Sequence, residues 1–107
     1  IIQNAKLYRN NIAIAQVDHT VGRVTAAQAA DELLNIAGID TSFVLFPSDG
    51  KVMISARSTG DVNVQVILEK LGGGGNAATA GAQVPSESVS DVTRSLVQAI
   101  EQYFEDE

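Results

Sequence analysis

Short apolar segments alternate along this chain with segments in which apolar residues recur at helical spacing. Residues 12–17 (IAIAQV) form a nearly continuous apolar run, which is typical of a strand buried on both faces. Residues 5–9 fit two interpretations: a partner strand across an Asn10-Asn11 turn, or the end of a helix that begins upstream. The pattern at this end of the chain therefore predicts at least one buried strand.

A hairpin is predicted in the middle of the chain. Residues 43–46 and 51–57 have the composition of strands, and the four residues between them, PSDG, are turn formers. Strand alternation places side chains 52, 54 and 56 on one face, which we expect to be core. The opposite face then carries Met53, Ser55 and Arg57, so a hydroxyl and a guanidinium emerge together near the strand end.

The first predicted helix begins at a capping box. Thr25 is expected to be the N-cap, with Gln28 at the third helical position. Small and apolar residues then share one face as far as Ala37, and Gly38 is suited to end the helix. The many alanines in this segment favour close packing against a sheet.

Two further helices are predicted in the second half. Residues 62–71 carry apolar side chains at helical spacing, and either Asp61 or Thr59 is placed to cap them. Residues 82–84 are expected to form a short strand, and Ser88 is expected to begin the last helix. The order of elements predicts an α/β (α+β) domain, with a mixed sheet of about four to five strands that includes the hairpin and packs with three helices.

Length and composition support a single folded domain over residues 1–107. The chain is 45% hydrophobic and has no cysteine, so neither a disulfide framework nor a thiolate metal site is expected. No apolar run has the length of a membrane span, so we expect a cytoplasmic domain without direct membrane contact. The first residue is not Met, which indicates a piece of a longer protein, and that parent can still be membrane-anchored.

The charge balance limits the class of ligand. The formal net charge is −6, with seven Lys and Arg spread along the chain. Proteins that bind long nucleic acid through its phosphates need clustered positive charge. Any phosphate site is therefore expected to be local, which favours a small ligand.

The run Gly72-Gly73-Gly74-Gly75 is the strongest candidate for chemistry. Glycines allow several N–H groups to point at one anion and allow a ligand to approach the main chain closely. A flexible linker and an ordinary helix stop are the alternative interpretations. Small residues continue to Gly81 between two structured segments, which favours a phosphate cradle over a linker.

Residues 54–64 (ISARSTGDVNV) and 71–75 (LGGGG) resemble the C-terminal DHH-associated domain of DHH-family phosphoesterases. The matching features are a Ser-x-Arg strand end, an Asn-Val at a helix start and four glycines, and the resemblance extends from about Ile12 into the last helix. The chain is most similar to the bacterial cyclic-di-AMP phosphodiesterases. The resemblance implies substrate contacts by Ser55, Arg57, Ser58, Asn63, Gly72, Gly73, Gly74, Gly75 and Asn76.

One position departs from the family pattern. The family has His after the glycines, whereas this chain has Asn76. A neutral amide cannot supply the charge-assisted hydrogen bond that a protonated His gives, so phosphate affinity is expected to be weaker. The chain's one His, His19, lies in a polar turn, where we expect a surface role.

The resemblance also implies a division of labour. An upstream DHH domain of the same parent would hold two Mn²⁺ ions and hydrolyse cyclic di-AMP or short oligonucleotides, while this domain positions the substrate phosphate. The domain alone is then not catalytic and holds neither catalytic residues nor metal ligands. Its partners would be cyclic di-AMP or a linear dinucleotide and the DHH domain. The alternatives are an RNA- or tRNA-binding module, as in the related domains of alanyl-tRNA synthetases, and a homodimerisation module.

Overall fold

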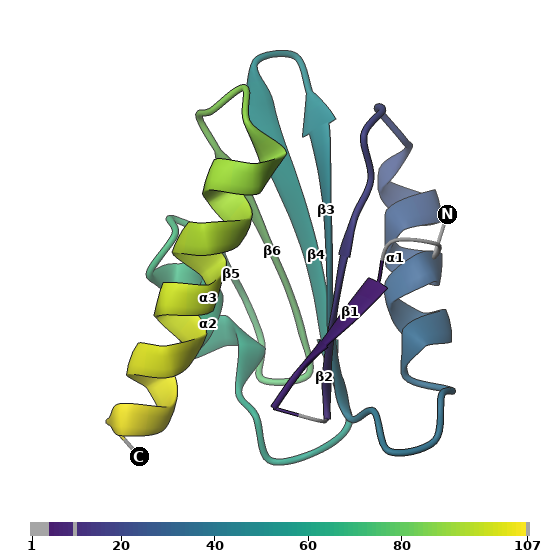
Figure 1. The fold of residues 1–107 in the computed structure, drawn as a ribbon, viewed down its shortest axis with the longest axis vertical. Helices are drawn as coiled ribbons and strands as arrows, with labels where there is room; N and C mark the ends of the chain where they lie inside the picture. Colours follow the sequence, from purple (N-terminus) through teal and green to yellow (C-terminus); the bar gives the residue numbers. More distant parts are fainter. Residues whose placement is uncertain (1–4, 10, 107) are drawn as a thin grey trace.

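Six strands form one sheet, in the order β1-β2-β3-β4-β6-β5, in the computed structural model, which describes residues 5–9 and 11–106 (Figure 1). The strands are β1 (Ala5–Tyr8), β2 (Ile12–Gln16), β3 (Thr41–Ser48), β4 (Lys51–Ser58), β5 (Gly74–Gly75) and β6 (Thr79–Val84). The helices of the described residues are α1 (Arg23–Leu33), α2 (Val64–Glu69) and α3 (Val89–Glu105).

The sheet is mixed, as predicted. β2 and β3 run parallel and are connected through α1, whereas every other neighbouring pair is antiparallel. The sheet has more strands than the four to five expected, because a very short strand, β5, adds to one edge. At the other edge β1 pairs with β2, so residues 5–8 form the partner strand and not the end of a helix. Asn10, predicted to lie in the connecting turn, is outside the described residues.

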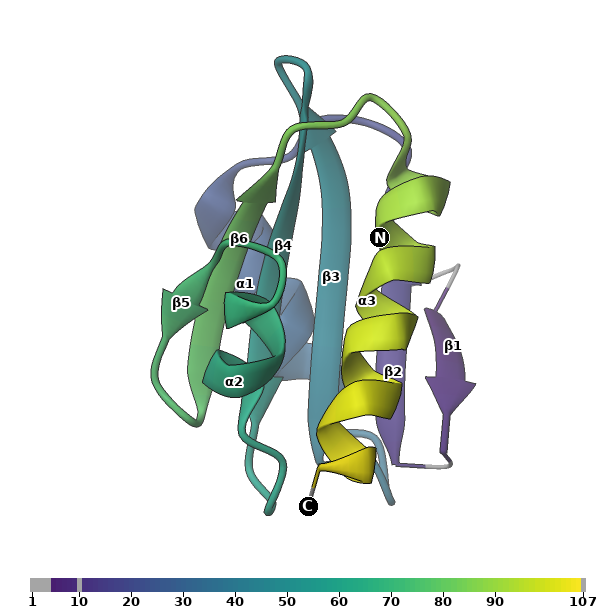
Figure 2. The same ribbon diagram turned by 90° about the vertical axis from the view of Figure 1, so that its left-hand side faces the viewer.

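Helices cover both faces of the sheet. α1 packs on β3 and β4 from one side, and α2 and α3 pack from the other side (Figures 1 and 2). The core under α2 and α3 is built from large side chains such as Phe43, Leu45 and Leu96, each fully buried. The core under α1 relies on small ones, including Ala26 and Ala30, and this lets α1 lie close to the sheet.

The β3–β4 hairpin is confirmed and is longer than predicted. Pro47 and Ser48 belong to β3, and the turn consists of Asp49 and Gly50 alone. Both turn residues have positive φ, 50° and 76°, as a two-residue turn that matches strand twist requires. The predicted alternation along β4 is also confirmed, because positions 52, 54 and 56 are buried and positions 53, 55 and 57 are half-buried.

The predicted capping box of the first helix is wrong. α1 begins three residues earlier, and its N-cap, Gly22, provides no side-chain hydrogen bond. The Gly22 carbonyl accepts the N–H of Ala26 at 3.0 Å, so Thr25 already lies within the first turn. The helix also ends before Ala37: its last residue is Leu33, and the N–H groups of Leu34, Asn35 and Ile36 donate to carbonyls three residues back, in tighter turns.

The second helix is shorter than predicted, and its cap is neither Asp61 nor Thr59. Asn63 is the N-cap, and its side-chain oxygen accepts the N–H of Val66 at 3.3 Å. The predicted start of the last helix is confirmed, since the Ser88 hydroxyl accepts the N–H of Asp91 at 3.1 Å.

Candidate functional site

A hollow lies beside α1 where the sheet carries almost no side chains. Ser55 of β4 pairs with Gly81 of β6, which in turn pairs with Gly74 of β5. Directly paired residues of antiparallel strands project to the same face. This row across three strands therefore presents one hydroxyl and two bare glycines, and the missing side chains leave a cavity of about 720 Å³.

This space, here called the Arg57 cavity, brings five of the nine sequence-predicted site residues together. They are Ser55, Arg57, Gly72, Gly73 and Gly74. The other described residues that line it come from α1, β3, β4 and β6: Arg23, Ala27, Phe46, Met53, Ile54, Ala80, Gly81, Ala82 and Gln83.

Arg57 lines this cavity and is anchored by two contacts. Its Nε lies 3.2 Å from Oδ1 of Asp31 on α1, and its Nη1 donates to the carbonyl oxygen of Ala56 at 2.8 Å. The side chain is only 18% exposed. A guanidinium has five N–H donors, and these contacts use two of them. Arg57 can therefore bind an anion in the cavity without giving up its anchors.

The first two glycines end α2 and do not offer their amides to a ligand. Gly72 has φ of 85°, and its N–H donates to the carbonyl of Glu69. The N–H of Gly73 donates to the carbonyl of Leu68 at 2.8 Å, which completes a Schellman motif. These two amides do not form the predicted phosphate cradle, because the helix end already uses them.

Close approach to β6 explains why side chains are absent from two of the four positions. A Cβ on Gly73 would lie 2.3 Å from the carbonyl oxygen of Gly81, and one on Gly75 would lie 2.3 Å from that of Thr79. Gly74 differs, because a Cβ there would meet no atom within 4 Å. The bare main chain at Gly74 is thus open to the cavity without any steric need of the fold.

Asn76 stabilises a turn and is not among the described residues that line the cavity. Its side-chain oxygen accepts the N–H groups of Ala78 and Thr79 at 3.0 and 2.9 Å. Its own N–H donates to the Thr79 carbonyl at 2.7 Å. The position after the glycines therefore shapes the β5–β6 connection in this chain.

Ser58 and Asn63 also lie outside the Arg57 cavity. Ser58 is 6% exposed, and its hydroxyl accepts the N–H of Gly60. Asn63 caps α2, and its N–H donates to the hydroxyl of Tyr103 at 3.0 Å. Both stabilise the segment between β4 and α2.

Sequence reasoning missed Arg23 and Gln83 as cavity residues. Gln83 is paired with Met53 and so faces the same side as Ser55, but only a three-residue strand was predicted there. Arg23 precedes the predicted start of its helix, so no helical spacing connected it with the site. Met53 and Phe46 also line the cavity, whereas Phe43 is fully buried on the opposite face of the sheet.

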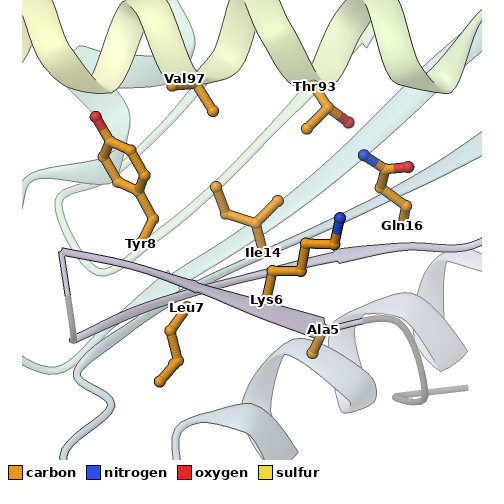
Figure 3. Close-up of a pocket in the computed structure, with 8 residues that line it drawn as sticks. All are labelled: Ala5, Lys6, Leu7, Tyr8, Ile14, Gln16, Thr93 and Val97. Atoms are coloured by element: carbon orange, nitrogen blue, oxygen red, sulfur yellow. The ribbon is translucent and has the colours of Figure 1, made fainter.

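A second cavity, of about 490 Å³, lies between β1 and α3 (Figure 3). Its polar side chains are Lys6, Tyr8, Gln16 and Thr93, arranged around Ile14 and Val97. None of the predicted site residues lines it. This cavity and the Arg57 cavity lie toward opposite edges of the sheet.

No group of three His, Cys, Asp or Glu side chains is placed to hold a metal ion within residues 5–9 and 11–106.

His19 lies at the surface, with Nδ1 3.0 Å from Oδ1 of Asp18. The hydrogen bond and charge of His19 lower the pKa of Asp18. Over the same described residues, no helix has the length and apolarity needed to cross a membrane.

The chain is a small α+β domain: one mixed sheet has helices on both faces, and an arginine lines a cavity on it. Within that class the chain belongs to the DHHA1 domain family, whose sequence model matches residues 9–106. The chain is 46% identical over 108 residues to the cyclic-di-AMP phosphodiesterase GdpP of Geobacillus thermodenitrificans. That match covers 98% of this chain and 16% of the relative. The resemblance seen in the sequence is confirmed.

Solved structures share the fold. An exopolyphosphatase-related protein from Bacteroides fragilis superposes with a TM-score of 0.81 at 21% identity, covering 94% of this chain and 32% of that one. The C-Ala domain of Aquifex aeolicus alanyl-tRNA synthetase gives a TM-score of 0.69 at 14% identity, covering 92% of this chain and 96% of that one. At these identities the likeness concerns the fold alone, so function has to be argued from the site.

Proposed function

We propose that this domain binds cyclic di-AMP or a short linear dinucleotide in the Arg57 cavity and positions its phosphate for hydrolysis by a DHH domain of the same parent protein. The observation that carries the proposal is the meeting of Arg57, Ser55 and Gly74 in one cavity. The 46% identity to a cyclic-di-AMP phosphodiesterase supports the substrate class.

The phosphate is assigned to Arg57. A guanidinium presents a planar fork that matches two phosphate oxygens, and a charge-assisted hydrogen bond is about twice as strong as a neutral one. Asp31 and the Ala56 carbonyl hold the fork in one orientation, so little side-chain entropy is lost on binding. The Ser55 hydroxyl, on the same face of β4, adds a donor or acceptor beside it.

The bare row of Gly81 and Gly74 gives the sugar or base room to lie against the sheet. Met53 borders the same space, is half-buried and offers apolar surface for an adenine ring, whereas Phe46 lines the space but is only 2% exposed. The glycines therefore act through shape, by leaving space, rather than through a set of free amides.

Hydrolysis is assigned to another part of the parent protein. The relative at 46% identity is about six times longer than this match, since the match covers 16% of it. Mn²⁺ held by a DHH domain would polarise the phosphate and activate water. This domain's own contribution is to orient the substrate and to balance negative charge at its phosphate.

An amide NMR titration of this chain with cyclic di-AMP, and separately with its linear product, tests the proposal. We expect shifts concentrated at Ser55, Arg57, Gly74 and Gly81. The variant Arg57→Gln should lose most of the response, and Arg94→Gln, on the exposed face of α3, should retain it. Unmoved amides at these four positions with millimolar ligand would overturn the proposal.

An RNA-binding role is the alternative to be separated by the same titration. The fold likeness to the C-Ala domain leaves it open, but the net charge of −6 opposes retention of a long polyanion. Binding of single-stranded RNA of about 20 nucleotides with no response to dinucleotides would favour that role over the one proposed.

A further inference from the structure

We infer that the Arg57 cavity holds a second anion subsite at Arg23, so that the domain selects ligands with two phosphate groups over ligands with one. This inference rests on the proposed function and extends it to a residue of α1. The second subsite is the end of the cavity nearest the start of α1, where Arg23 borders the same space as Arg57.

Helix geometry places Arg23 on the same face of α1 as Asp31, the ion-pair partner of Arg57. Arg23, Ala27 and Asp31 are spaced at i, i+4 and i+8, so they share one face of α1 and span about 12 Å along its axis. Arg23 and Ala27 line the cavity, and Asp31 contacts Arg57. Ala27, which lies between Arg23 and Asp31 on this face, has a small side chain. A ligand lying along this helix face meets one cation at each end.

The distribution of charge favours an anionic ligand. The chain has 13 acidic and seven basic residues, yet the only ionisable side chains among the described residues that line the cavity are Arg23 and Arg57. Two cations without a lining carboxylate are unexpected on so acidic a surface. Asp31, which is not among those lining residues, offsets the charge of Arg57 at 3.2 Å, so the net positive charge at the cavity comes from Arg23, although the net charge of the whole chain is −6.

Arg23 also stands apart from the other arginines. Arg9 pairs with Glu101, Arg57 with Asp31 and Arg94 with Asp91. Within the described part of the chain, Arg23 has no carboxylate at ion-pair distance. All of its N–H donors can therefore be offered to a phosphate, and no internal ion pair has to break first.

The test compares two linear diadenylates that differ by one phosphate. Diadenylate with a 5′-phosphate (pApA) has two phosphate groups, and ApA has one. Isothermal titration would measure both affinities for the wild-type chain, Arg23→Gln and the charge-matched control Arg94→Gln. We expect Arg23→Gln to weaken pApA binding about tenfold while ApA binding stays unchanged, in line with the loss of one charge-assisted contact. The control should change neither affinity.

The outcomes separate this inference from the proposed function. Equal weakening of both ligands by Arg23→Gln, or no weakening of either, would overturn the second subsite while leaving dinucleotide binding in place. Failure of the wild-type chain to bind either diadenylate would overturn both. Recovery of part of the pApA affinity in Arg23→Lys, which keeps the charge without the fork, would support a direct phosphate contact.

Discussion

Gly73 and Gly74 are neighbours in the sequence, yet a side chain fits at only one of them. A Cβ on Gly73 would collide with the main chain of β6, whereas one on Gly74 would enter open space. The two residues therefore serve different purposes: Gly73 allows close packing, and Gly74 keeps the cavity floor bare. This difference makes them a matched pair for mutation.

We predict that Gly74→Val keeps the stability of the domain and abolishes nucleotide binding. Its φ is negative and its Cβ has no neighbour, so the free energy of unfolding should change by less than about 0.5 kcal/mol. The added methyl groups would occupy the space assigned to the ligand. Urea unfolding and titration with cyclic di-AMP measure the two effects.

Gly73→Ala serves as the counterpart. Its Cβ would lie 2.3 Å from a carbonyl oxygen, so the backbone must shift, at a cost of about 1–3 kcal/mol. Full ligand affinity in folded Gly74→Val would contradict the assigned role of the bare floor.

Asp31 provides a second prediction at this scale. Its carboxylate lies 3.2 Å from Nε of Arg57 and competes electrostatically with an incoming phosphate. Because the Asp31 side chain is 64% exposed, the pair should contribute no more than about 1 kcal/mol to stability. We predict that Asp31→Asn tightens dinucleotide binding about two- to threefold at low salt, by removing a nearby negative charge.

Glu32→Gln is the control for Asp31→Asn, since it removes the same charge from an exposed neighbouring position of α1. Weaker binding in Asp31→Asn, with Glu32→Gln unchanged, would mean that the carboxylate acts mainly by positioning Arg57.

At the scale of elements, helix ends decide how the site is framed. α2 has only six residues, so its cap and its glycine stop fix most of its geometry. The Asn63 side chain begins the helix, and Gly72 and Gly73 end it. This short element connects the end of β4, which carries Arg57, to β5.

We predict that Asn63→Ala lowers the free energy of unfolding by about 1 kcal/mol through loss of the N-cap. Asn63→Asp should retain most of the stability, because it keeps an acceptor for the N–H of Val66. Dinucleotide affinity of the folded variants should be unchanged, since Asn63 lies outside the Arg57 cavity. Thermal unfolding by circular dichroism and a parallel titration would measure both. Lost affinity at normal stability would instead support the substrate contact that the family resemblance implies.

For the whole molecule, charge determines how binding responds to salt. A ligand held at Arg57 and Arg23 neutralises about two phosphates, so log K against log[salt] should have a slope no steeper than about −1.4. Titration of pApA between 50 and 300 mM NaCl, roughly the range over which such slopes are read, measures it. A much steeper slope, together with tighter binding to long RNA, would favour the polyanion-binding alternative.

The central strands β2, β3 and β4 and the two faces of β4 were predictable because they follow local rules. The two-residue turn between β3 and β4 needs positive φ, which the Asp49-Gly50 pair supplies, and alternation along β4 then places Ser55 and Arg57 together. The ends of α1 and α2 were not predictable in this way. Gly22 caps α1 without a side chain, and Asn63 caps α2 in place of the expected Asp61 or Thr59.

The sequence by itself determined the class of fold, the family and the face on which Arg57 lies, because periodicity, turn chemistry and the glycine motif are local properties of the chain. Only the tertiary structure decided what each glycine does and which cations share the cavity. Gly81 and Gly74 form its floor because β6 and β5 pair in one register, and Arg23 joins it because α1 crosses β4 at a particular position. The β4–β6 register and the placement of α1 on the sheet depend on contacts between residues far apart in sequence, which a local pattern does not encode.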